Sequence, residues 1–235
     1  MPRIILIETS TSLCSTALVE GTGITSRRES TEPRAHAAST AVFVSEMLRE
    51  RGLEVRDCDA VCLSSGPGSY TGLRVGSSSA KGLCFGAGIP LISVCTLDVL
   101  AHQAISGGLV PEGCSTVIPL IDARRMEVYS AVYSVKVADC TIERISDIRP
   151  TIVDADSFRG EMERGSVLFI GDGVDKCREV LDSTNSHFVQ TCPRAEAMLA
   201  PALAAWNEKR FENTAYFEPL YLKDFVATVS RKKLF

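Results

Sequence analysis

The sequence is poor in the residues that build metal and peptidase sites. Its 235 residues include three histidines, His36, His102 and His187, which lie far apart. There is no H-x-x-x-H pair and no C-x-x-C pair, so no spacing supports a metal site. The same scatter gives no argument for a Ser–His–Asp triad. We therefore expect no metal site, and we interpret His36 as a capping or surface residue.

Excess positive charge and long apolar runs are also missing. The formal net charge is −4, so bulk electrostatics do not favour nucleic-acid binding. Every uncharged stretch is shorter than the roughly 20 residues of a membrane helix, and the apolar run at 4–7 is too short for a signal peptide. The nine cysteines are odd in number and mostly sit in apolar runs, which suits free thiols in a reducing compartment. We expect a cytoplasmic protein without membrane contact.

A strand, a glycine-rich break and a helix organise the chain. Residues 60–63 are apolar and predict a buried strand, and the motif GPGSYTGLRVG follows at 66–76. Ser69 or Thr71 can cap the helix expected over 71–86. Gly72, Gly76 and Ala80 are four apart and share one helix face. This smooth face either packs inside its own domain or meets a partner subunit.

The chain divides into two similar halves, and this element belongs to the first. Strands are expected at 4–7, 14–19, 24–28 and 91–94 in the first half, with helices at 37–51 and, capped by Thr96, at 97–106. The second half predicts strands at 116–122, 127–133, 141–145, 166–170 and 187–189, and helices at 174–181 and 196–208. The first strand of each half ends on an acid, Glu8 or Asp122. We predict an α/β chain with two duplicated subdomains, 1–106 and 107–235, of the actin-like ATPase/sugar-kinase (ASKHA) fold.

Several motifs resemble the TsaB (YeaZ) family over nearly the whole chain. They are the glycine motif at 66–76, the opening hairpin at 7–18, Arg34-Ala35-His36, the second hairpin at 121–129, and residues 219–223. The resemblance implies a non-catalytic subunit that pairs with TsaD and the ATPase TsaE to make threonylcarbamoyladenosine beside the tRNA anticodon. It further implies a homodimer when the chain is alone, tRNA contact only through the complex, and ATP handled by the partner subunits rather than by this chain.

The same resemblance suggests two sets of functional residues. The helix after the glycine motif would contact the partner through Tyr70, Gly72, Leu73, Val75, Gly76, Ser79 and Ala80. Candidate motif and cleft residues are Glu8, Thr9, Arg34, His36, Gly66, Pro67, Gly68, Ser69, Thr71, Arg74, Asp122, Arg124, Glu127 and Tyr221.

An enzyme of the same fold, a nucleotide-dependent transferase or a glycoprotease-like hydrolase, is the alternative. Such folds usually carry an aspartate where this chain has Glu8, and arginines rather than glycines follow Asp122. The turn at 171–173 is too short for an adenosine loop. Asp122, Arg124 and Glu127 form either a solvated hairpin tip with local ion pairs or a cleft or partner contact, and Tyr221 and Lys223 are equally open.

Overall fold

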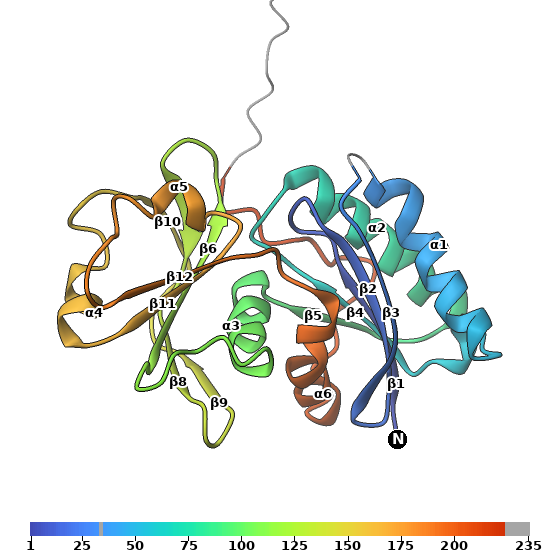
Figure 1. Ribbon diagram of the computed structural model, residues 1–235. Coiled ribbons are helices and arrows are strands. Elements are labelled where there is room, and N and C mark those ends of the chain that lie inside the picture. Colours follow the sequence, from blue (N-terminus) through green and yellow to red (C-terminus); the bar gives the residue numbers. More distant parts are fainter. Residues whose placement is uncertain (33–34, 224–235) are drawn as a thin grey trace, which may run out of the picture.

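The structure is a computed structural model that describes residues 1–32 and 35–223. Two lobes stand side by side, each built on a mixed β-sheet (Figure 1). The predicted two-part α/β architecture is therefore confirmed. Arg34 and the basic residues at 231–233 lie outside the described residues.

The first sheet has the strand order β3-β2-β1-β4-β5. These strands are β1 (Arg3–Glu8), β2 (Cys14–Glu20), β3 (Gly23–Ser30), β4 (Ala60–Ser64) and β5 (Leu91–Val94). The first three form an antiparallel meander, and β4 and β5 run parallel to β1. Residues 4–8 of β1 are fully buried, as expected for a central strand whose two faces are both covered.

Helices cover both faces of the first sheet. On one face, α1 (Ala35–Glu50) and α2 (Tyr70–Ala87) enclose a core that includes Ile5 and Ile7, with the short η1 (Val55–Asp57) nearby. On the other face, η2 (Ala195–Met198) and α6 (Leu199–Asn207) pack against Ile4 and Leu6. The alternation of side chains along β1 sends consecutive residues to opposite cores.

The second lobe follows the order β10-β7-β6-β11-β12, with β8 and β9 attached beside β6. Its elements are α3 (Thr96–Ser106), β6 (Thr116–Asp122), β7 (Glu127–Ser130), β8 (Tyr133–Lys136), β9 (Thr141–Arg144), β10 (Arg149–Ile152), α4 (Arg159–Arg164), β11 (Val167–Gly171), α5 (Val174–Cys177) and β12 (Ser186–Gln190). β10 was not predicted, and α5 is shorter than the helix expected over 174–181.

The single strand predicted at 127–133 is wrong. The chain bends at Ala131 and Val132 and forms two strands. β7 pairs with the end of β6, and β8 pairs with the beginning of β6. The bend keeps its backbone groups satisfied, because Val132 N donates to the Ser146 Oγ (2.8 Å) and Val132 O accepts from Ile145 N (2.8 Å). The predicted cap of α3 also differs: Cys95 is the N-cap residue, and Thr96 is the first helical residue.

The chain crosses between the lobes more than once. Leu97 and Leu100 of α3 pack with Val117 and Ile121 of the second sheet, whereas α6 packs on the first. Residues 212–220 then return to β5, where Glu212 N donates to Leu91 O (2.8 Å). A single cut between residues 106 and 107 therefore does not separate the two lobes.

In the part of the chain that the structure describes, no helix combines the length and apolar character needed to cross a membrane. All nine cysteines are free thiols, and six of them are buried.

Candidate functional site

The glycine motif forms the passage from β4 into α2. Gly66 has φ of +105°, a conformation that favours glycine, and the Gly66–Pro67 peptide bond is cis. Ser69 is the N-cap of α2, because its Oγ accepts a hydrogen bond from Gly72 N (3.3 Å). Of the two predicted caps, the structure therefore selects Ser69, and Thr71 is exposed on the first turn.

The inner face of α2 is packed against the first hairpin. A Cβ on Gly72 would overlap Thr9 O, and one on Gly76 would overlap the Thr9 Oγ1. Thr9 also donates from its Oγ1 to Gly72 O (2.9 Å). The residues of this inner face are buried: Gly72, Leu73, Gly76, Ser77, Ala80 and Cys84.

This burial corrects the predicted partner surface. The face of Gly72, Gly76 and Ala80 exists as predicted, but the chain's own hairpin occupies it, so a partner cannot dock there. Of the other predicted interface residues, Leu73 is buried, and Tyr70, Val75 and Ser79 are half-buried. A partner role for the half-buried three stays a prediction.

The outer face of α2 carries a second stripe of small residues. Ser78, Gly82 and Gly86 are four apart and exposed, and the Cβ positions of both glycines face open space. Phe85 projects beside them with 89% of its surface exposed. These residues were not predicted from the sequence, although their spacing of four and the single phenylalanine among small side chains are signals that it contains.

A groove of about 850 Å³ runs between α1 and α2 beside this stripe. Apolar side chains from both helices and the loop after α1 line it, among them Val44, Leu48, Leu53 and Leu83. We call the outer face the α1–α2 surface and define it by Ser78, Gly82, Phe85, Gly86 and the residues that line this groove.

Three residues predicted separately meet at the N-terminal end of α2. The Tyr70 and Tyr221 rings lie 4.9 Å apart, and the Arg74 guanidinium lies over the Tyr70 ring at 4.0 Å. Cation–π and ring contacts of this kind stabilise an ordered contact between chain segments. These contacts hold the C-terminal segment at Tyr221 against the first turn of α2, about 150 positions earlier in the chain.

The end of β1 buries an acid. Glu8 is 0% exposed; its Oε1 accepts from Ser10 N (2.6 Å), and its Oε2 has no hydrogen-bond partner among the described residues. Burial raises the pKa of Glu8 to about 7, although the hydrogen bonds from Ser10 lower it in part. A buried carboxyl group with this raised pKa holds a proton more readily than it binds a cation from solvent.

The rest of the first hairpin is also engaged within the lobe. Ser69 N donates to Ser10 O (2.6 Å), and a Cβ on Gly68 would overlap that same oxygen. His36, interpreted as a capping or surface residue, places its Nε2 2.9 Å from Thr11 O. The turn between β1 and β2 is thus covered by the glycine motif.

The second hairpin is closed by ion pairs. Lys176 pairs with Asp122, and Lys223 pairs with Glu127. Asp122 also accepts from Arg124 N (2.8 Å), and Arg124 lies in the left-handed region with φ of +72°. These ion pairs are not local to the hairpin: they join it to α5 and to the C-terminal segment, at residues 54 and 96 positions later in the chain.

Asp172 faces this hairpin and was not singled out from the sequence. Its Oδ1 accepts from Asp122 N (2.9 Å), and burial raises the pKa of the Asp172 carboxyl to about 6. The negative charge of Asp172 also contributes to raising the pKa of Glu8, so the two carboxyl groups, one in each lobe, repel each other. Within residues 1–32 and 35–223, no group of three or more histidine, cysteine or acidic side chains could hold a metal ion.

Comparison with known proteins gives a consistent set of similarities. The family model described as TsaD, tRNA N6-adenosine threonylcarbamoyltransferase, matches residues 25–230. The tRNA threonylcarbamoyladenosine biosynthesis protein TsaB of Escherichia coli K12 is 31% identical over 96% of both chains. The YeaZ structure from Pseudomonas aeruginosa has a TM-score of 0.81 at 25% identity, covering 94% of this chain and 100% of that one.

A second solved structure, described as an uncharacterized protein with similarity to peptidase YeaZ from Pseudomonas aeruginosa, has a TM-score of 0.78 at 25% identity. It covers 95% of this chain and 100% of its own. Together with the two-lobed topology, these matches confirm the predicted actin-like ATPase/sugar-kinase fold class. The chain belongs to the TsaB (YeaZ) family, and its domain is of the TsaD type.

Proposed function

We propose that this chain is a non-catalytic subunit of the machinery that makes tRNA threonylcarbamoyladenosine, and that it binds a TsaD-type subunit through the α1–α2 surface. The observation that carries the proposal is Phe85, a large apolar side chain that is 89% exposed beside two exposed glycines. Single exposed apolar residues are ordinary, but an aromatic anchor beside an apolar groove is typical of an interface.

The shape of the α1–α2 surface supports close docking of a helix. Gly82 and Gly86 leave a smooth strip on which another backbone can approach, and the neighbouring groove of about 850 Å³ offers apolar walls from Leu48 and Leu83. A self-complementary patch can form a C2 homodimer and can also accept a subunit of related fold. The same surface would therefore also serve the self-association that we propose for the chain when the TsaD-type subunit is absent.

The state of the first hairpin supports a role without catalysis. Glu8 is fully buried and its carboxyl retains a proton up to about pH 7, which disfavours binding of Mg²⁺. Ser10 O is already occupied by Ser69 N. We infer that ATP is handled by the TsaD-type subunit and a TsaE-type ATPase, and that tRNA meets this chain only within the complex, in keeping with its net charge of −4.

The alternative is an enzyme acting on a nucleotide or a peptide across the cleft. Titration of the isolated chain with ATP and Mg²⁺ separates the two hypotheses. Binding in the submicromolar range would favour the enzyme, because a covered hairpin and a buried Glu8 leave little basis for tight phosphate binding.

Reconstitution tests the proposal itself. Purified TsaD-type and TsaE-type subunits are assayed for tRNA threonylcarbamoylation with and without this chain, and co-purification with the TsaD-type subunit is measured in parallel. We expect modification to depend on this chain and the two subunits to co-elute. Full modification without this chain would contradict the proposal.

A further inference from the structure

Two arginines stand at the tip of the β6–β7 hairpin without a carboxylate partner. Arg124 and Arg125 are both exposed, and neither guanidinium forms an ion pair or a hydrogen bond with any residue that the structure describes. The acids of the hairpin, Asp122 and Glu127, each pair with a lysine instead. Asp172, the third acid at this end, is half-buried and accepts from Asp122 N. Both guanidinium groups are therefore available to a ligand in solution.

The backbone at the tip has a conformation that arginine adopts at a cost. Arg124 and Arg125 have φ of +72° and +51°, in the left-handed region where asparagine and glycine are the usual residues. Arg124 N donates to the Asp122 Oδ1 (2.8 Å), and Glu127 N donates to Arg124 O (3.1 Å). These hydrogen bonds form the turn without either guanidinium group. The fold of the described residues therefore does not require arginine at these two positions.

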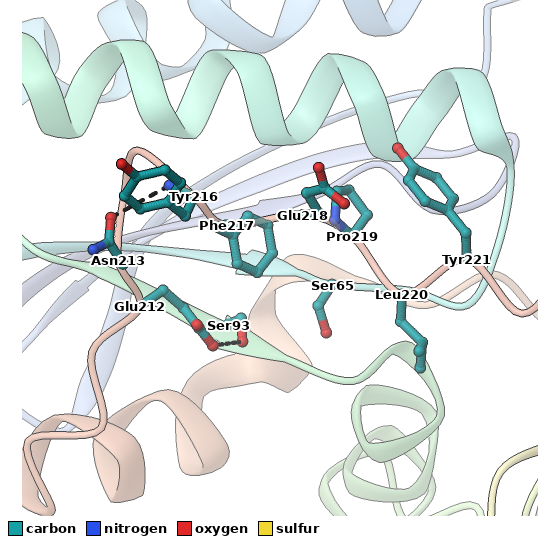
Figure 2. Close-up of a pocket in the computed structure, with 10 residues that line it drawn as sticks. All are labelled: Ser65, Ser93, Glu212, Asn213, Tyr216, Phe217, Glu218, Pro219, Leu220 and Tyr221. Atoms are coloured by element: carbon teal, nitrogen blue, oxygen red, sulfur yellow. Dashed lines mark hydrogen bonds between the residues drawn. The ribbon is translucent and has the colours of Figure 1, made fainter.

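A series of contacts joins this tip to the first turns of α2. Lys223 pairs with Glu127 of the hairpin. Two residues earlier in the chain, the Tyr221 ring lies 4.9 Å from the Tyr70 ring, and the Arg74 guanidinium lies over Tyr70. Arg74 is also exposed and forms no ion pair with a described residue. Figure 1 shows the hairpin tip and the start of α2 at the same end of the two lobes, and Figure 2 shows Tyr221 beside α2.

We call Tyr70, Arg74, Arg124, Arg125 and Tyr221 the basic strip. We propose that the basic strip contacts the sugar–phosphate backbone of tRNA when this chain is bound to the TsaD-type subunit, so the inference rests on the proposed function. The guanidinium group is planar and can donate two parallel hydrogen bonds to one phosphate. Basic side chains beside aromatic rings are typical of RNA-binding surfaces, because the rings offer stacking faces to unpaired bases.

The charge of the neighbouring groove limits where the tRNA can lie. Tyr221 also lines a groove of about 640 Å³, which Figure 2 shows together with Glu212 and Glu218. Both acids are exposed, and neither forms an ion pair with a described residue. Carboxylates repel phosphate, so a backbone that touches Tyr221 is directed towards the arginines of the hairpin and away from this groove.

The basic strip is separate from the α1–α2 surface. Arg74 precedes Phe85 by about three turns of α2, which places them roughly 16 Å apart along the helix axis. Protein interfaces bury an apolar centre, as Phe85 and its groove would provide, whereas the strip combines unpaired charges with aromatic rings. One chain can therefore contact the TsaD-type subunit and the tRNA at different ends of α2. The net charge of −4 belongs to the whole chain and does not oppose a local basic strip.

Binding of tRNA to the complex of this chain with the TsaD-type subunit tests the proposal. The strip variant removes the three arginines and carries Arg74→Gln, Arg124→Asn and Arg125→Asn. Asparagine is used in the turn because it tolerates a positive φ. A second variant changes only the turn and keeps the contact of Arg74 with Tyr70. The control variant loses the same charge from exposed arginines elsewhere and carries Arg56→Gln, Arg159→Gln and Arg164→Gln.

Fluorescence anisotropy of labelled tRNA, repeated over a range of salt concentrations, gives the affinity of each complex. We expect the strip variant to bind tRNA about tenfold or more weakly than the wild type, with the turn variant in between. The slope of log affinity against log salt should fall by about two for the strip variant, since each lost phosphate contact lowers it by ~0.7–0.9. The control variant should match the wild type, and circular dichroism should show that all variants are folded.

Co-elution with the TsaD-type subunit is measured before tRNA is added, and it separates the possible failures. Wild-type tRNA affinity and salt slope in the strip variant would overturn the proposal. Loss of co-elution in the strip variant alone would also overturn it, because the strip would then be a protein contact. If the wild-type chain does not co-elute, the proposed function fails and the basic strip loses its role with it.

Discussion

Gly76 of α2 lies so close to Thr9 that a Cβ on the glycine would overlap the threonine Oγ1. Gly82, six residues later on the same helix, has open space at its Cβ position. The two glycines therefore serve different purposes. Gly76 allows the helix to pack on the first hairpin, whereas Gly82 is not required by any contact within the lobe.

Alanine at these two positions should have opposite effects on stability. Gly76→Ala is expected to lower the free energy of unfolding by about 1–3 kcal/mol, because the methyl group is forced against Thr9. Gly82→Ala is expected to raise it by about 0.5–1 kcal/mol, since alanine favours a helix over glycine. Urea denaturation of both variants measures the difference. A change in the free energy of unfolding with the same sign in both variants would contradict the assignment of the inner and outer faces of α2.

The cap of α2 gives a second matched pair. Ser69→Ala removes the side-chain oxygen that accepts from Gly72 N and should cost about 1 kcal/mol of unfolding free energy. Thr71→Ala alters an exposed residue of the first turn and should change stability by less than about 0.5 kcal/mol. Denaturation midpoints under identical conditions report both values. A larger loss at Thr71 than at Ser69 would show that the cap is misassigned.

Glu8 should make stability depend on pH. Its folded-state pKa of about 7 lies above the ordinary value of 4.5, so the unfolded chain ionises first. The stability that the protonated carboxyl contributes is present below about pH 4.5 and is lost as the pH rises to about 7. Glu8→Gln keeps an acceptor for Ser10 N and removes this loss.

The Glu8→Gln variant should therefore gain stability over the wild type at pH 8 but not at pH 4.5. The shift in pKa corresponds to a difference of about 3 kcal/mol between the two conditions. Asp172 titrates in both proteins, so the difference between them retains only its charge interaction with Glu8. Unfolding free energies at the two pH values measure the effect. A stability difference that stays constant with pH would contradict the raised pKa.

Periodic, buried elements could be predicted from the sequence. The runs that form β1 and β4 are apolar over several residues, and α1 and α2 show helical spacing. The strands that were missed or merged lie in the second lobe. β10 has only four residues and is largely exposed, so its side chains carry no pattern of burial. The strand preference of a short segment cannot identify such strands, because they form only by pairing with strands elsewhere in the chain.

The site was predicted only in part, for a similar reason. The sequence of α2 contains two stripes spaced by four, one through Gly72 and Gly76 and one through Gly82 and Gly86. Spacing identifies both but does not say which one faces the core. That depends on Thr9, more than 60 residues earlier in the chain. The approach of Asp172 to Glu8 across the lobes is likewise set by tertiary structure.

A charge placed on Phe85 tests whether the α1–α2 surface binds the TsaD-type subunit. Phe85→Asp is compared with Ile152→Asp, which alters an apolar residue that is 73% exposed on β10 of the other lobe. Circular dichroism should show that both variants remain folded. Binding to the TsaD-type subunit is then measured by titration, and self-association by sedimentation.

If the account is correct, Phe85→Asp weakens binding by about 30-fold or more, as expected for loss of an aromatic anchor worth at least ~2 kcal/mol. It should also abolish self-association, while Ile152→Asp behaves as the wild type in both measurements. Wild-type affinity of a folded Phe85→Asp variant for the TsaD-type subunit would contradict binding through the α1–α2 surface.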